Sequence, residues 1–148
     1  MDNEKDSRAI DAIARTCIAV RLRLLNRVVT NLYDDALRPL GLKVSQLNVL
    51  VVTAKLGVAQ PAKVCDLLQL DTSTLSRNVE RMCARGWLRL VQDADRRSHL
   101  IEVTDNGQAL IRKCLPAWQK AQAEVSRRLG TKTITELRCA LRKLSVRN

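Results

Sequence analysis

The chain has 148 residues, enough for one domain with a sizeable hydrophobic core and too few for two independent domains. Its 26 Lys and Arg against 15 acidic residues give a formal net charge of +11, which favours a polyanionic partner without distinguishing DNA, RNA and an anionic membrane surface. An acidic N-terminus, no apolar run of membrane-spanning length and five cysteines without a Cys-x-x-Cys pair argue against secretion and membrane insertion, so we expect a soluble cytoplasmic protein.

The first third of the chain is predicted to form helices. Apolar residues recur every three or four positions over residues 10–36, which predicts one long helix that Pro39 and Gly41 end. Ser45 can cap a second helix that runs to about Gly57.

A helix-turn-helix is predicted next. Pro61 lies where the first turn of a short third helix begins. Asp71 or Thr72 can cap a fourth helix, from about Ser73 to Arg85, and Gly86 supplies its end. Two short helices joined by a tight turn are typical of this motif.

After this motif the apolar period changes to two, which is typical of strands. Residues 87–91 and 100–103 are therefore predicted to form a β-hairpin with a charged tip at residues 92–99. Thr104 or Asp105 can then cap a long helix that is bent near Pro116 and ends at Gly130. A last helix is predicted from its apolar stripe, which consists of Ile134, Leu137, Leu141 and Leu144.

The predicted fold class is mainly α with a small β-hairpin wing. Residues 1–148 are expected to form a single winged helix-turn-helix domain, with its DNA-binding lobe at about 44–107. The flanking helices, at about 8–38 and 108–147, have apolar stripes without a counterpart in so small a domain, so we expect them to form a homodimer. A two-fold dimer reads a palindrome in double-stranded DNA, with half-sites about 10 bp apart.

The fourth helix carries the candidate recognition surface. At 100° per residue, Leu75, Val79 and Met82 fall on one side and polar residues on the other. Hydroxyl groups near a helix N-terminus suit phosphates, and an arginine one turn later is long enough for guanine in the major groove. A solvated helix face without a DNA role is the alternative. The candidate DNA-binding residues are Ser73, Thr74, Ser76, Arg77 and Arg81.

The hairpin tip is the second candidate contact. Arg96 and Arg97 are expected to place a guanidinium in the narrow minor groove. Asp93 and Asp95 beside them are expected to orient an arginine by an ion pair, or to cap the turn. A salt-bridged hairpin that does not touch DNA is the alternative.

These residues resemble the MarR family of bacterial transcriptional regulators. The resemblance spans most of the chain, and its motifs are Leu70-Asp71-Thr72-Ser73-Thr74-Leu75-Ser76-Arg77, Gly86-Trp87-Leu88, Asp93-Ala94-Asp95-Arg96-Arg97-Ser98 and Val103-Thr104-Asp105-Asn106-Gly107. It implies a homodimer clasped by its first and last helices, with recognition helices in successive major grooves and wings in the flanking minor grooves. Many such regulators are repressors released by a small, often aromatic or anionic ligand bound between the dimer helices and the DNA-binding lobe.

The sequence says less about an effector. Phe is absent and Tyr33 is the only Tyr, so an aromatic ligand cage is poorly supported. Arg21, in the apolar stripe of the first helix, is a candidate for an anionic ligand, with an inter-helix ion pair or a snorkelling side chain as alternatives.

A redox-responsive regulator is another alternative. One branch of the family senses peroxides through a cysteine, but this chain has Ala19 at that position and Val44 in place of a partner tyrosine. Cys17 and Cys114 lie on apolar stripes, whereas Cys139 projects away from its stripe and is the thiol expected to be most exposed.

Other function classes find less support. His99 is the only histidine, and no nucleophile–base pair, phosphate loop or clustered metal-ligand spacing accompanies it, so we expect no enzyme, no metal and no cofactor. A sequence-neutral architectural or protein-interaction module remains the main alternative, because the net charge would hold any nucleic acid. The basic C-terminal part is either a solvated dimer arm or a further phosphate-contacting surface.

Overall fold

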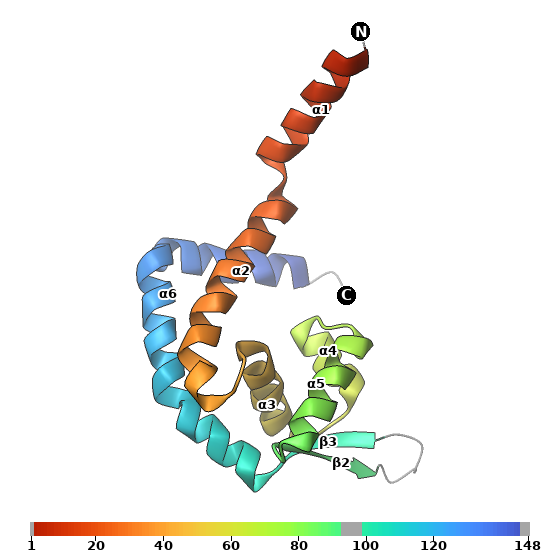
Figure 1. The fold of residues 1–148 in the computed structure, drawn as a ribbon, viewed down its shortest axis with the longest axis vertical. Helices are drawn as coiled ribbons and strands as arrows, with labels where there is room; N and C mark the ends of the chain where they lie inside the picture. The colour runs from red at the N-terminus through yellow and green to blue at the C-terminus, as the bar shows by residue number, and fades with distance from the viewer. Residues whose placement is uncertain (1, 93–98, 146–148) are drawn as a thin grey trace.

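The computed structural model of the protein describes residues 2–92 and 99–145. Figure 1 shows a lower lobe of short helices with a small sheet, flanked by α2 and α6, and the N-terminal helix α1 projecting away from the body. This arrangement confirms the predicted fold class, which is mainly helical with a small antiparallel wing. The elements in chain order are α1 (Asp2–Thr16), α2 (Ile18–Leu37), the 3-10 helix η1 (Arg38–Leu40), α3 (Val44–Leu56), β1 (Val58–Ala59), α4 (Pro61–Leu68), α5 (Thr72–Ala84), β2 (Leu88–Gln92), β3 (His99–Val103) and α6 (Asp105–Ser145).

The prediction of one long helix over residues 10–36 was wrong. Cys17 has extended backbone angles (φ −60°, ψ 109°) and separates α1 from α2. The guanidinium of Arg21 donates to the carbonyl oxygens of Cys17 and Arg15, which lie on either side of the end of α1. An apolar period shows which face of a segment is buried, but it does not show whether the backbone hydrogen-bond ladder is continuous.

The start of α3 also differs from the prediction. Ser45 is not its cap, because the helix begins at Val44 and Ser45 is exposed within its first turn. The backbone N–H of Val44 donates to the carboxylate of Asp34 on α2 (2.7 Å), and that of Lys43 donates to the Gln46 side chain (3.1 Å). A residue of the preceding helix therefore supplies a helix cap that the local sequence does not indicate.

The sheet has three antiparallel strands in the order β1-β3-β2. The two predicted wing strands are present, and Leu88 pairs with Val103 at their base. The additional strand β1 pairs Ala59 with Ile101, and both of these residues are buried. Two residues are too few to show a period in the sequence, which is why β1 was not predicted.

The buried residues in the described part of the chain form two hydrophobic clusters. The larger one joins α3, α4, α5 and the sheet, and its fully buried members include Leu50, Leu75, Met82 and Ile101. The smaller one holds α2 against α6 through Tyr33, Ala121 and Val125, with partly buried residues around them. Within residues 2–92 and 99–145, no helix has both the length and the apolar character needed to cross a membrane.

The long helix α6 changes direction at Gly130, which has a left-handed φ of 78°. Figure 1 shows that the first part of α6 runs beside α2, and the part after the kink turns across it. The predicted end of a helix at this glycine is therefore confirmed. Glycine suits the position because an L side chain rarely adopts this backbone conformation.

Candidate nucleic-acid interface

Local sequence determines both ends of α5, the predicted recognition helix. Asp71 is its N-cap and accepts a hydrogen bond from the backbone N–H of Thr74 (2.8 Å). At the other end the N–H of Trp87 donates to the Met82 carbonyl and that of Gly86 to the Cys83 carbonyl, both at 2.9 Å. With Gly86 at φ 68°, this is a Schellman motif, so the helix begins and ends as the sequence predicts.

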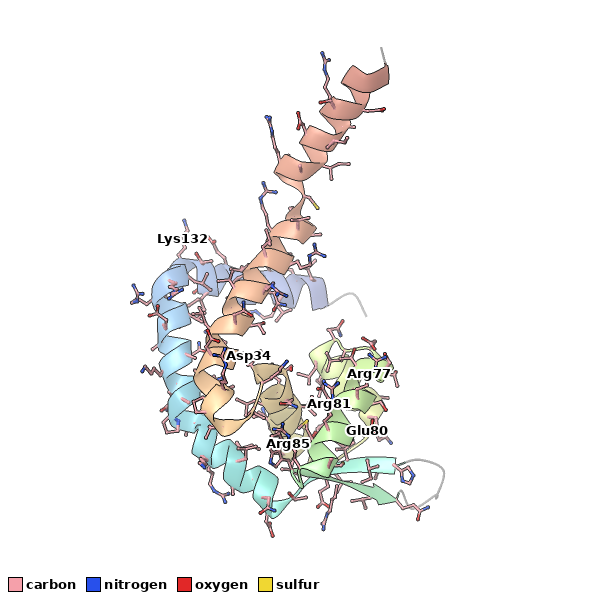
Figure 2. The ribbon with its side chains drawn as sticks, in the orientation of Figure 1. Asp34, Arg77, Glu80, Arg81, Arg85 and Lys132 are labelled. Atoms are coloured by element: carbon pink, nitrogen blue, oxygen red, sulfur yellow. The ribbon has the colours of Figure 1, made fainter. Side chains whose placement is uncertain are left out.

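One face of α5 packs against the lobe and the other faces solvent. Leu75, Val79 and Met82 are buried in the larger cluster, as the helical projection predicts. Ser73, Ser76, Arg77 and Arg81 are exposed, and Thr74 is half-buried. Figure 2 shows Arg77, Glu80 and Arg81 along this helix. The structure thus brings the predicted recognition residues together on one accessible helix face.

The hydroxyl groups at the start of α5 are already engaged. Ser73 Oγ and Thr74 Oγ1 donate to the two carboxylate oxygens of Asp71, at 2.6 and 2.7 Å. These hydrogen bonds, together with that from the Thr74 N–H, hold the pKa of Asp71 well below its usual range. Because phosphate oxygens only accept hydrogen bonds, the hydroxyls of Ser73 and Thr74 would have to turn away from Asp71 to contact one.

The predicted wing residues Asp93, Asp95, Arg96 and Arg97 lie outside the described residues. The strands that lead to them are described, and they carry a cross-strand ion pair. Arg89 Nε lies 2.6 Å from Glu102 Oε2, and the two residues are direct partners in the register of β2 and β3. The hydrogen bond and the opposite charge raise the pKa of Arg89. This arginine is therefore paired within the sheet.

Two further candidates are placed differently from the prediction. Arg21 is exposed at the junction of α1 and α2, where backbone carbonyl groups occupy its guanidinium. Cys139 is half-buried, like Cys17, Cys65 and Cys83, so the structure does not single it out as the exposed thiol. Burial raises the pKa values of the Cys83 and Cys114 thiols, which disfavours their reactive thiolate forms.

Sequence reasoning missed Arg85, the residue after α5. Its Nη1 donates to the carbonyl oxygen of Gly41 (2.5 Å), and its guanidinium lies 4.9 Å from the centroid of the Trp87 ring. The spacing of an arginine two residues before a tryptophan is a weak local signal for the stacking. The contact with Gly41, 44 residues away, has no signal in the sequence.

An apolar cavity of about 340 Å³ lies between the lobe and α6. It is open to solvent, and its size is within the range of small-ligand sites. Among the described residues, no group of three or more His, Cys, Asp or Glu is placed to hold a metal ion. The cavity is lined by Leu47, Asn48, Val51, Val52, Leu68, Ile111, Cys114, Leu115 and Trp118.

Comparisons with known proteins agree with this geometry. Residues 40–98 match the model of the MarR family. The multiple antibiotic resistance protein MarR of Salmonella typhimurium is 26% identical over 123 residues, which cover 82% of this chain and 85% of that protein. The Mycobacterium tuberculosis transcriptional regulator MOSR, solved in complex with DNA, is 32% identical, covers 88% of this chain and 94% of that chain, and gives a TM-score of 0.77. BpsR of Bordetella bronchiseptica, solved to explain regulation of its DNA binding by 6-hydroxynicotinic acid, is 22% identical with a TM-score of 0.78 and covers 88% and 94%.

A helix-turn-helix with a solvent-facing recognition helix, followed directly by a two-stranded wing, defines the class of winged helix-turn-helix transcriptional regulators, which bind DNA. The match covers the helix-turn-helix and the first wing strand, β2, and the structural likeness extends over the flanking helices. The chain belongs to the MarR family.

Proposed function

We propose that this protein is a homodimeric repressor that binds a palindromic operator and is released by a small ligand. The observation that carries the proposal is the accessible polar face of α5, held to the lobe by Leu75, Val79 and Met82 on its opposite side. In this proposal Arg77 and Arg81 reach base edges in the major groove and Ser76 contacts a phosphate. Ser73 and Thr74 act mainly through the helix N-terminus that Asp71 caps.

The wing completes the proposed interface. Arg96 and Arg97 enter the minor groove beside each recognition helix, and Asp93 and Asp95 orient them. The lobe at about 44–107 then forms the DNA-binding part of one domain, and the helices at about 8–38 and 108–147 form the dimerisation part. This role has no catalytic step, which agrees with the regulatory relatives of the chain.

Exposed apolar side chains on the terminal helices support the dimer. A single chain leaves large hydrophobic residues on three helical segments open to solvent, and a second copy would cover them. They are Ile10 and Ile13 on α1, Ile18, Val20, Leu22, Leu24 and Val28 on α2, and Leu137, Leu141 and Leu144 on the last part of α6.

The cavity beside α6 supports release by a ligand. A molecule bound there would touch α3 and α4 of the lobe and α6 of the dimerisation part at the same time. Its apolar lining, with Trp118 as the aromatic member, favours a ligand with an apolar body. The structure of BpsR, a protein of the same fold, was solved to explain control of DNA binding by 6-hydroxynicotinic acid.

Selection of bound duplexes from random-sequence DNA, at physiological salt with competitor DNA, tests the proposal. We expect a palindrome with half-sites about one helical turn apart. Replacing Arg77 by Ala should reduce the binding free energy by about 1–3 kcal/mol per contacted base pair and relax the base preference at that position. Arg96→Ala and Arg97→Ala should instead weaken binding evenly on all sequences. Uniform coverage by the wild type would instead indicate a sequence-neutral DNA-binding module, and equal loss on all sequences from Arg77→Ala would refute its assigned role.

A further inference from the structure

Three segments meet at the C-terminal end of the recognition helix. Arg85 follows α5, and its guanidinium stacks on Trp87 and donates to the carbonyl oxygen of Gly41 (2.5 Å). Gly41 follows the short helix η1 that continues α2, and an ideal Cβ on Gly41 would lie 3.3 Å from Arg85 Nη1. Figure 2 shows Arg85 at the end of α5 that lies beside the sheet. This one side chain therefore joins the end of α5 to the turn that follows α2 and η1.

The start of α6 holds the same segment from another side. Thr104 Oγ1 donates to the Gly86 carbonyl (2.6 Å), and the Thr104 N–H donates to the Trp87 carbonyl (3.1 Å). A Cβ on Gly107 would lie within 2.7 Å of Val103 Cγ1 and closer still to the Trp87 carbonyl oxygen. The contact with α6 is thus made largely through backbone atoms at close range. On the α2 side, Leu37 shares the larger hydrophobic cluster with α5, and the Arg85 side chain adds a hydrogen bond to the turn that follows η1.

We propose that Arg85 is a positioning residue that fixes the recognition helix relative to α2, and thereby sets the separation of the two recognition helices in the dimer. The proposal rests on the proposed function, a dimer that reads a palindrome. Because α2 carries exposed apolar side chains such as Leu24 and Val28 toward the partner copy, the position of α5 relative to α2 fixes its distance from the two-fold axis. Arg85 then controls which half-site spacing the dimer accepts, without itself reading a base.

Half-site spacing is a sensitive probe of how firmly α5 is held relative to α2. One additional base pair between the half-sites moves them apart by about 3.4 Å and rotates one relative to the other by roughly 35°. A dimer with firmly held recognition helices loses much of its affinity for the altered duplex. A dimer in which each α5 can shift relative to α2 loses less, because it adapts to the new spacing.

The experiment measures Kd on two duplexes, the palindrome selected by the wild type and the same palindrome with one central base pair inserted. The ratio of the two Kd values is the readout, and it is measured for the wild type, Arg85→Ala, Arg85→Lys and Arg112→Ala. Arg112 is an exposed cation on α6, so its removal is a control for the lost charge. We expect Arg85→Ala to lower the ratio by about fivefold or more, Arg112→Ala to leave it unchanged, and Arg85→Lys to restore part of it, because an ammonium group can still donate to Gly41 and lie over the ring.

A direct phosphate contact by Arg85 predicts a different outcome. Arg85→Ala would then weaken both duplexes equally and lower the salt slope of binding by about two per dimer, with the Kd ratio unchanged. That outcome, or an unchanged ratio at unchanged affinity, would overturn the inference. If the wild type itself bound both duplexes equally, the proposed function, a dimer that reads a palindrome, would be refuted. That result would be known from the wild type alone, before any variant is compared.

The stacking can be tested separately by fluorescence. The chain has two tryptophans, so in a Trp118→Phe background the emission comes from Trp87 alone. A guanidinium over one face of the ring shields it from a neutral quencher such as acrylamide. We expect Arg85→Ala to increase acrylamide quenching in this background and Arg112→Ala to leave it unchanged. Equal quenching with and without Arg85 would show that the contact is not formed in solution.

Discussion

The hydroxyl of Thr53 is buried at the centre of α3 without a hydrogen-bond partner among the described residues. A buried, unsatisfied polar group costs free energy relative to an apolar group of the same shape. We therefore expect Thr53→Val to raise the free energy of unfolding by about 1–2 kcal/mol, measured by urea denaturation at a fixed protomer concentration. Thr53→Ser, which keeps the hydroxyl and removes the methyl group, should lower it. A Val variant no more stable than the wild type would indicate that the hydroxyl is hydrogen-bonded in solution.

Asp71 provides a pH-dependent contribution to stability. Its carboxylate accepts hydrogen bonds from Ser73 and Thr74, and these depress its pKa below the ordinary value of 3.8. A depressed pKa in the folded state means that the contribution is present above that ordinary value and is lost as the pH falls through the folded-state pKa. We expect the wild type to melt at a higher temperature than Asp71→Asn at pH 7, because asparagine caps the helix but lacks the charge. The difference should shrink below about pH 4, and a constant difference from pH 7 to pH 2.5 would contradict this prediction.

At the scale of helices and strands, the first turn of α6 makes a close contact with the segment that follows α5. Gly107 is buried there, and a Cβ at this position would meet the Trp87 carbonyl oxygen and Val103 Cγ1. Because the nearest atom belongs to the backbone, α6 would have to move away from the segment that follows α5.

Gly107→Ala is expected to lower the free energy of unfolding by about 2–3 kcal/mol, measured by thermal or urea denaturation. The neighbouring Asn106→Ala is the matched control, since Asn106 is exposed in the same turn and its replacement should change stability little. If Gly107→Ala were as stable as Asn106→Ala, the close approach of α6 to Trp87 would not exist in solution.

At the scale of the whole molecule, the terminal helices expose large apolar side chains that a monomeric protein would ordinarily bury. Ile13 on α1 and Leu141 on α6 are each 67% exposed, although both belong to apolar stripes. Several large apolar side chains exposed on the same helical segments indicate an interaction site, and the proposed partner is a second copy of the chain.

Leu141→Glu tests this surface. If a second copy covers it, burying the carboxylate is unfavourable and the variant should dissociate to monomers at concentrations at which the wild type is a dimer, as measured by sedimentation equilibrium. Leu67→Glu is the matched control, because Leu67 is 53% exposed but lies on α4 in the DNA-binding lobe. A Leu141→Glu protein that stays dimeric would exclude the last part of α6 from the interface.

Local patterns in the sequence determined the recognition helix and its surroundings. The cap at Asp71, the buried side of Leu75 and Val79 and the Schellman end at Gly86 all follow from interactions within a few residues, so their residue types and spacing are sufficient to predict them. The class of fold and the solvent-exposed face of α5 could therefore be predicted without coordinates.

Only the tertiary structure decided the contacts between segments distant in the chain. The carboxylate of Asp34 caps α3 from ten residues away, and Arg85 reaches a carbonyl group 44 residues away. Strand β1 has its partner in β3, and the backbone turns out of helical geometry at Cys17 although the apolar period continues across it. Such contacts depend on how the helices are placed in space. The apolar periodicity of the sequence indicates which face of a helix is apolar, but it does not indicate which surface packs against that face.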